Sequence, residues 1–323
     1  MTNQEFQKLT RQAWSKYPQI TEEIRLELLK TYKDASELVK IEVLRAERLG
    51  LSGITIESKN AINQQLDRGV AMLLPETEKA IASGIIKTID IENDITNSWI
   101  NTAAKQAGLT PFNMIPLNSV VRDKVLTITL TRNFQDGYLL SDRIWQSASL
   151  YKTDMSRVIN LGLAQGKDNI TIAKAITQYI NLGKEGILPA NVYGKIIRGN
   201  TDIYNRLSQN VDWRALRLIR SEEAMSIQAA QLLRGEDNPG CTGQYKWVKN
   251  AFTANDCTCN SLAAGSPYTY ETIPDYPHPN CLCRIEQILR PRAEFIADLK
   301  SWGSGGSVPY MDKWYNDKYL LTI

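Results

Sequence analysis

Apolar residues recur every three or four positions along the N-terminal part of the chain, and this spacing strongly restricts how it can fold. It places the apolar side chains on one face of an α-helix. Thr21 is the expected N-cap of this helix, and Gly50 marks its expected end. Further amphipathic helices are expected over about 57–83 and 92–106, as bundle elements or as partner-docking surfaces. The apolar face of the first helix consists of Ile20, Ile24, Leu28, Tyr32, Ala35 and Val39.

The pattern changes between about residues 110 and 140, where a domain boundary is expected. Pro111 and Pro116 interrupt the helical periodicity, and residues 125–130 alternate as in a strand. A segment of helical core is the alternative for these residues. Helices are expected again from Tyr138, and the first of them ends at Gly166.

Two more helices are expected before the C-terminal part of the chain. Residues 168–171 offer N-caps for the first, and the second covers about 212–234. Beyond Cys241, short strands and turns replace the helices, beginning with an alternating strand at 244–248. The sequence therefore predicts a mainly α-helical protein with an elongated helical N-terminal region and a small β-rich C-terminal subdomain that contains cysteines, an α+β arrangement.

The last residues of the chain have a distinct composition. The Gly/Ser segment 303–307 is typical of a flexible linker, and the tail at 308–323 is rich in aromatic residues. Two interpretations of the tail are open. It docks on a partner protein, or it folds back on the helical body and buries its own aromatic rings.

Composition limits the class of protein without identifying it. Hydrophobic residues make up 43% of the 323 residues and charged residues 23%, which is enough apolar material for a core. The net charge of +3 comes from interleaved signs, so it neither requires nor excludes DNA as a partner. The first thirty residues do not resemble a signal peptide. The apolar stretch at 70–74 is far too short to cross a bilayer, so no membrane partner is expected.

Four of the five cysteines lie close together near the C-terminus. In a reducing cytoplasm such a group is better explained by metal binding or free thiols than by disulfides. The candidate ligands of a structural zinc ion are Cys257, Cys259, His278, Cys281 and Cys283. Two cross-strand disulfides and inert buried thiols are the alternatives. Cys241 is expected to lie outside the site, in a loop or turn.

The sequence offers few groups for catalysis. His278 is the only histidine, and it stands inside the cysteine group. A nucleophile–histidine pair would therefore have to use it. The chain also lacks the glycine-rich phosphate-binding motifs and the zinc-deaminase signature. We therefore expect no enzymatic activity, no catalytic residues and no organic cofactor.

The order of these features resembles the head-morphogenesis domain of Mu F-like minor head proteins of tailed bacteriophages. The similar segments are Ile219–Glu223 at a helix, Lys246–Val248 in a tryptophan-containing strand, Asp256–Leu262, and the His-Pro-Asn-Cys-Leu-Cys close at 278–283. Residues 159–166 also resemble the helix that leads to this motif, and the similarity covers about 140–290. Three departures are the tighter spacing of the first cysteine pair, Ala264-Gly265 in place of the usual acidic-Gly step after Leu262, and a leucine at 282, where arginine is frequent.

The resemblance implies a capsid component associated with the portal vertex and capsid interior, which acts in procapsid assembly, DNA packaging or ejection. It implies three regions: a portal- or capsid-docking helical region at 1–135, the head-morphogenesis domain at 136–295 with its Cys/His cluster at 241–284, and the linker and tail at 296–323. The expected partners are the portal protein, the major capsid or scaffolding protein, and double-stranded DNA. The protein would be made in the host cytoplasm and reside in the virion.

The alternative hypothesis is a zinc-containing protein that binds or processes nucleic acid. Arg214, Arg217 and Arg220 lie three residues apart and would share one flank of a helix. They are the candidate phosphate-binding patch in this alternative.

Overall fold

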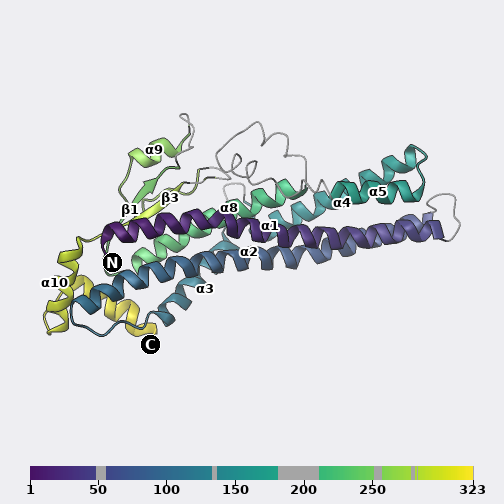
Figure 1. Ribbon diagram of the computed structural model, residues 1–323. Coiled ribbons are helices and arrows are strands. Elements are labelled where there is room, and N and C mark those ends of the chain that lie inside the picture. The colour runs from purple at the N-terminus through teal and green to yellow at the C-terminus, as the bar shows by residue number, and fades with distance from the viewer. Residues whose placement is uncertain are drawn as a thin grey trace. The chain divides into compact units, whose positions relative to one another are not determined.

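The structure is a computed structural model that describes residues 1–48, 56–132, 137–180, 211–250, 257–277, 281 and 283–322 (Figure 1). It is mainly helical, as expected, with a small antiparallel sheet near the C-terminus. The helices are α1 (Asn3–Arg48), α2 (Ile56–Gln106), α3 (Ile115–Thr131), α4 (Leu140–Ala164), α5 (Asn169–Ile180), α8 (Val211–Glu236), α9 (Cys259–Ala264), α10 (Arg292–Gly303) and α11 (Pro309–Trp314). The strands are β1 (Cys241–Val248), β2 (Tyr268–Thr269) and β3 (Arg284–Leu289), and short helical turns cover Tyr315–Tyr319 and Leu320–Thr322.

The chain forms two compact units, each assembled from segments that are distant in sequence. The first unit comprises Met1–Thr21, Ser83–Thr131 and Arg220–Ile323. The second comprises Glu22–Ala82 and Arg132–Ile219. The division into three functional regions at residues 135 and 295 stays a prediction, because compactness does not show which region does what.

The second unit is a bundle of amphipathic helix segments, as the apolar spacing predicts. The expected face of α1 is buried, and Gly69 of α2 lets the two helices approach closely, since a Cβ there would lie 3.3 Å from the Cβ of Ala35. Tyr151 of α4 packs edge-on against Tyr32, with ring centroids 5.6 Å apart. The Tyr151 hydroxyl also lies 2.7 Å from Ser36 Oγ, which satisfies both polar groups inside the bundle.

The predicted end of α4 and the predicted start of α5 are confirmed. Gly166 follows α4 with a φ of 65°, the left-handed conformation that glycine adopts most easily after a helix. Asp168 then caps α5, because its carboxylate accepts a hydrogen bond from the Thr171 backbone N–H at 2.6 Å. The apolar side chains of Ile172, Ala173 and Ile176 in α5 are buried, whereas those of Tyr179 and Ile180 lie outside the described ones.

The first two helices are longer than predicted. α1 begins at Asn3 and continues past Thr21, so the predicted N-cap at Thr21 is wrong. The Thr21 hydroxyl donates instead to the carboxylate of Glu223 from inside the helix. The two helices expected over 57–83 and 92–106 are one helix, α2, which contains Pro75. Gly50 lies outside the described residues.

Residues 125–130 are helical, so their predicted strand is wrong and the alternative of helical core is confirmed. They belong to α3, which buries Leu117, Val121 and Val125 at helical spacing. The Thr129 hydroxyl donates to the Val125 carbonyl at 2.9 Å and lies 2.7 Å from Ser226 Oγ on α8. Packing within the first unit overrides the strand propensity of these β-branched residues.

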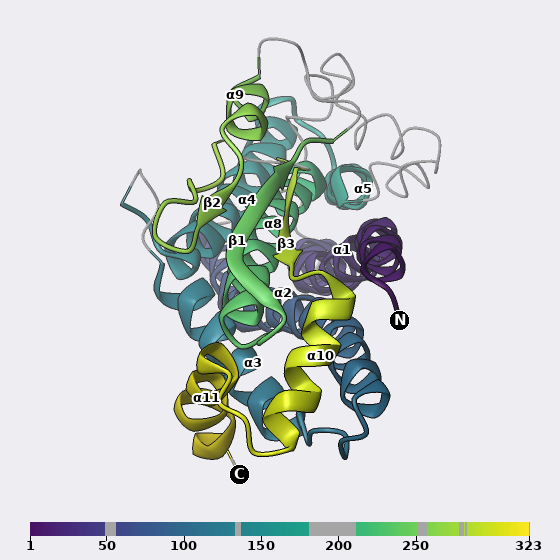
Figure 2. The same cartoon turned by 90° about the vertical axis from the view of Figure 1, so that its left-hand side faces the viewer.

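The sheet of the first unit has the order β2-β1-β3, and both pairings are antiparallel (Figure 2). Tyr245 at the centre of β1 pairs with Tyr268 on β2 and with Gln287 on β3. Its hydroxyl donates to the Leu232 carbonyl of α8 at 2.9 Å, which ties the sheet to that helix. Gly235 allows this contact, because a Cβ there would lie 2.2 Å from the same hydroxyl.

The aromatic tail folds back into a core of the first unit, so this interpretation of the tail is the one the structure has. Met311 and Trp314 are buried beside Phe295 and Trp99, and the Trp314 indole donates to the Asp237 carbonyl at 2.7 Å. The predicted flexible linker is a tight turn instead. Gly306 N donates to the Ser301 carbonyl at 2.9 Å and closes the turn between α10 and α11.

Truncation of Phe295 should strongly destabilise this core. Phe295 is fully buried and stacks on Trp99 with ring centroids 5.0 Å apart, so Phe295→Ala leaves a cavity. We expect a loss of about 3–5 kcal/mol in the free energy of unfolding, measured by urea denaturation. Ile115→Ala is the control: Ile115 is 73% exposed, and its loss should change stability by no more than about 0.5 kcal/mol. Equal effects of the two variants would contradict this description of the core.

Candidate metal centre

Three cysteines from two separate segments meet inside the first unit. Cys259 is the first residue of α9, and Cys281 and Cys283 directly precede β3. We call β1, β2, α9, β3 and the described residues between them the cysteine subdomain. Its core contains the three cysteines together with Tyr245, Trp247 and Ile285. In the chain, β1 comes before α9, and Cys281 and Cys283 come directly before β3. The antiparallel pairing of β1 with β3 therefore brings these two cysteines close to Cys259.

The three sulfur atoms are close enough to share one metal ion. The Sγ atoms of Cys259, Cys281 and Cys283 all lie within 4.8 Å of one another, and all three residues are buried. Sulfur ligands of a tetrahedral zinc ion lie about 3.8 Å apart when each Zn–S bond is ~2.3 Å long. The separation of 3.4 Å between Cys259 Sγ and Cys281 Sγ is near that value. The cluster could therefore hold a metal ion.

The disulfide alternative is not what the structure contains. All five cysteines are free, and 3.4 Å is well beyond the ~2.05 Å of a sulfur–sulfur bond. A metal site and a group of buried thiols are the two interpretations that fit these distances.

The thiols of the cluster are hard to ionise without a metal. Hydrogen bonds with Cys281 and Cys283, followed by burial, raise the pKa of Cys259 far above its ordinary value. The hydrogen bond with Cys259 lowers the pKa of Cys281, but the bond with Cys283 and burial outweigh it and raise the pKa to about 12. A thiol with a raised pKa is a weak nucleophile at neutral pH, so this arrangement does not activate a cysteine for covalent catalysis.

The structure places the remaining predicted ligands differently. Cys257 is half-buried and packs against the cluster, but it is not part of the group of three. His278 lies outside the described residues. The first Cys-x-Cys pair is not a stretch of strand, because Cys259 already belongs to helix α9.

Cys241 lies apart from the cluster, but not in the loop predicted for it. It is the first residue of β1 and is buried, because β1 begins earlier than the apolar alternation indicates. Burial raises the pKa of its thiol to about 11. It is therefore a matched reference cysteine for experiments on the cluster.

Tyr276 is a supporting residue that the sequence does not single out. Its hydroxyl donates to the Cys283 carbonyl at 2.5 Å, and its ring lies 5.5 Å from the ring of Trp247. It therefore holds the second cysteine segment against β1. In the sequence, Tyr276 is simply an aromatic residue before Cys281. Nothing there distinguishes it from the nearby Tyr270.

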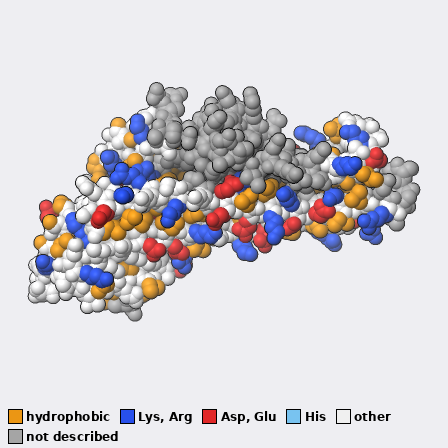
Figure 3. Space-filling model, in the orientation of Figure 1, with side chains coloured by type: hydrophobic (Ala, Val, Ile, Leu, Met, Phe, Trp, Pro, Cys, Tyr) orange, Lys and Arg blue, Asp and Glu red, His pale blue; other side chains and the backbone are white. Residues whose placement is uncertain are grey.

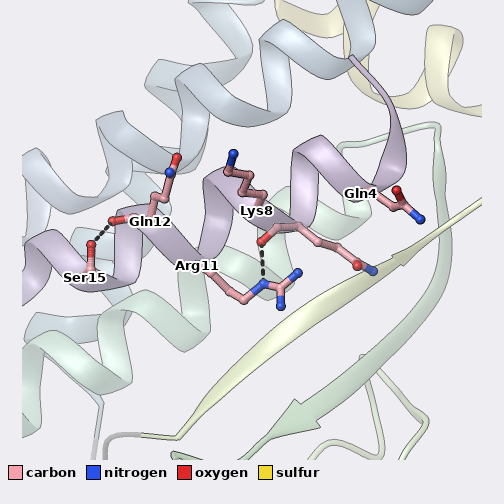
Figure 4. A pocket seen from close by; sticks show the side chains of 6 residues that line it. Gln4, Lys8, Arg11, Gln12 and Ser15 are labelled. Atoms are coloured by element: carbon pink, nitrogen blue, oxygen red, sulfur yellow. Dashed lines mark hydrogen bonds between the residues drawn. The ribbon is translucent and has the colours of Figure 1, made fainter.

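A surface depression on the outer face of α1 is the other candidate site (Figure 4). Its lining consists of Gln4, Gln7, Lys8, Arg11, Gln12 and Ser15, which follow one another at helical spacing. Arg11 Nε donates to the Gln7 carbonyl at 3.1 Å, so the guanidinium lies along the helix. Among the described residues, the lining contains no histidine, cysteine or carboxylate, so it offers positive charge and hydrogen bonds.

On the face drawn in Figure 3, neither positive nor negative charge dominates among the described residues. Figure 3 shows basic and acidic side chains interspersed along the helices, as the sequence predicts. The predicted patch of Arg214, Arg217 and Arg220 falls on α8, but these side chains lie outside the described ones. None of the helices in the described part of the chain combines the length and apolarity needed to cross a membrane.

Comparison with the models of known protein families gives no match, and neither curated proteins nor solved structures provide one.

Removal of a cluster cysteine should abolish metal binding. With Co²⁺ as the probe, we expect the thiolate-to-cobalt absorption band in the natural chain and its loss in Cys281→Ser, because a tetrahedral site loses one of its sulfur ligands. Cys241→Ser should keep the band, since Cys241 lies outside the cluster. If the unsubstituted, reduced protein shows no such band, the cysteine cluster is a group of buried thiols and not a metal site.

Proposed function

We propose that the chain is a minor capsid protein of the Mu F-like head-morphogenesis type, associated with the portal vertex and the capsid interior of a tailed bacteriophage. In this proposal it acts in procapsid assembly and in the packaging or ejection of DNA, and its role is structural rather than enzymatic. The portal protein and the major capsid or scaffolding protein are its partners, and the long N-terminal helices provide the docking surface.

One observation supports this proposal beyond the order of the motif. The residues that carry the resemblance are separated in sequence, yet Trp247, Cys259, Cys281 and Cys283 share one buried core. Glu223, from the helical part of the motif, is also buried and accepts the Thr21 hydroxyl of α1. These residues are buried and serve packing, which fits a structural role in assembly. None of them exposes a reactive group to solvent.

The proposal includes a structural zinc ion in the cysteine subdomain. Cys259, Cys281 and Cys283 would supply three thiolates, and Cys257 or His278 would complete a tetrahedral set. The ion would link α9 to the segment before β3. Because thiolate ligands must lose their protons, zinc would also offset the raised pKa values of these cysteines.

The test of the capsid role is the protein content of particles. In quantitative mass spectrometry of gradient-purified virions and procapsids from the source phage, we expect this chain at a small fraction of the copy number of the major capsid protein. The major capsid protein in the same samples is the internal reference. If the chain is missing from both kinds of particle, the proposal fails.

DNA binding is the second candidate function, and the depression on α1 favours it. Lys8 and Arg11 stand beside amide side chains and Ser15, which are the kinds of group that contact phosphates. With both cations exposed, the double variant Lys8→Glu/Arg11→Glu should weaken binding to duplex DNA and reduce its salt dependence, measured by fluorescence anisotropy at several salt concentrations. Lys79→Glu, on the exposed surface of the second unit, is the control. Equal binding by both variants would exclude this surface.

A further inference from the structure

A chain of buried polar side chains crosses the first unit from α1 to the sheet. Tyr17 Oη donates a hydrogen bond to Glu92 Oε1 on α2, and the Gln231 side chain on α8 also bonds to Glu92. Gln287 Nε2 on β3 donates to Gln231 Oε1 at 3.4 Å, and Asn238 Nδ2 donates to Gln287 Oε1 at 2.9 Å. All five side chains are buried, so these bonds are made without competition from bulk water.

The bonds all have the same polarity, and they end at Glu92. Each amide in the chain donates towards the carboxylate and accepts from the next amide behind it. A carboxylate only accepts hydrogen bonds, whereas a protonated carboxyl also donates one. A proton on the oxygen that faces Gln231 would therefore meet the NH₂ group of that amide, and the amide would have to turn over.

Turning one amide forces the next to turn. If Gln231 reversed, its NH₂ group would face the NH₂ group of Gln287, and the same conflict would pass to Asn238. Asn238 Oδ1 accepts the Gly240 backbone N–H at 2.9 Å in the turn that leads into β1. Reversal of Asn238 would remove this bond. The relay therefore ends at the turn that positions β1, the central strand of the cysteine subdomain.

We propose that Glu92 is a proton-operated switch that passes its charge state through Gln231, Gln287 and Asn238 to the turn before β1. Because the relay reaches the sheet that carries the cysteine cluster, a change of pH at α2 would alter the packing of the cysteine subdomain. This inference does not depend on the capsid role.

The groups around Glu92 place its titration near neutral pH. Burial raises the pKa of Glu92 to about 7, against the opposing effect of its bonds with Tyr17 and Gln231 and of the charges of Arg234 from α8 and Arg284 from β3. Burial also holds the pKa of Tyr17 well above its ordinary range, so Tyr17 stays protonated. Arg234, whose pKa burial lowers to about 10, stays charged near neutral pH.

Two further titratable groups act on Tyr17. They are Glu223 from α8 and Tyr276 from the segment before the second cysteine pair, and the charge of each would oppose ionisation of Tyr17. Burial also raises the pKa of Tyr276 well above its ordinary range. Neither tyrosine therefore ionises in the range where Glu92 titrates.

The direction of the effect on stability follows from the raised pKa. The folded protein binds the Glu92 proton more tightly than the unfolded chain, whose carboxyl has the ordinary value of 4.5. The contribution of Glu92 to stability is therefore greatest below pH 4.5, decreases as the pH rises and levels off above about pH 7. Glutamine stays uncharged at every pH, so Glu92→Gln removes this pH dependence. Relative to the natural chain, its melting temperature should therefore be higher at pH 8 than at pH 5.

The direct test is NMR of the side-chain amides of Gln231, Gln287 and Asn238 in the full chain between pH 5 and pH 8.5. We expect all three to shift with one common midpoint near pH 7, the pKa of Glu92. Glu92→Gln should abolish the shifts. Asp94→Asn, which removes an exposed carboxylate from the same helix, should leave them unchanged. Gln231→Met should abolish the response of Gln287 and Asn238 while the stability still varies with pH.

The outcomes separate the switch from a passive network. Amide signals that stay constant over this range in the natural chain would overturn the proposal, and this measurement requires no variant to fold. Shifts that persist in Glu92→Gln would overturn it as well, because another group would then be titrating. A response confined to Gln231 would show that the charge state does not reach the sheet and would also overturn it.

Discussion

The indole of Trp99 is the contact on which the packing of the first unit depends. The ring stacks on Phe295 of α10 and makes an edge-to-face contact with Phe6 of α1. The indole N–H donates to Asn3 Oδ1 at 3.2 Å, and the guanidinium of Arg292 lies 4.8 Å from the ring centroid. A single buried side chain of α2 thus joins residues from near the start of the chain to residues close to its end. Large aromatic side chains suit this role because each buries much apolar area.

Trp99 also determines the geometry of the turn that leads into β1. A Cβ at Gly240 would lie 2.1 Å from the indole, so only glycine fits there while the ring stays in place. The carbonyl of Gly240 accepts the Arg290 N–H at 2.8 Å, which joins this turn to the end of β3. Contacts with the helical core therefore determine where the strand pair β1 and β3 lies.

The cysteine subdomain has too few apolar residues to be stable by itself. Its sheet has three strands, of which β2 contains two residues, and three of its six buried core residues are cysteines. Small units of this kind usually need a metal, a disulfide or a larger partner to hold them. Here α8 supplies part of that support, because its Leu232 carbonyl accepts the Tyr245 hydroxyl of β1, and the close sulfur atoms provide a place for a metal ion. The subdomain is thus best understood as an extension of the helical core.

The sequence by itself determined the mainly helical fold, the buried face of α1, the glycine after α4, the N-cap of α5 and the grouping of the cysteines. These features depend on local periodicity and short-range hydrogen bonds, which neighbouring residues encode. Only the tertiary structure decided that residues 125–130 are helical, that the tail packs into the core that contains Trp99, and that Glu92 lies in a buried relay. These outcomes depend on contacts between residues far apart in the chain. No local pattern distinguishes Glu92 from a solvated glutamate, because its environment is created by α1, α8 and β3 together.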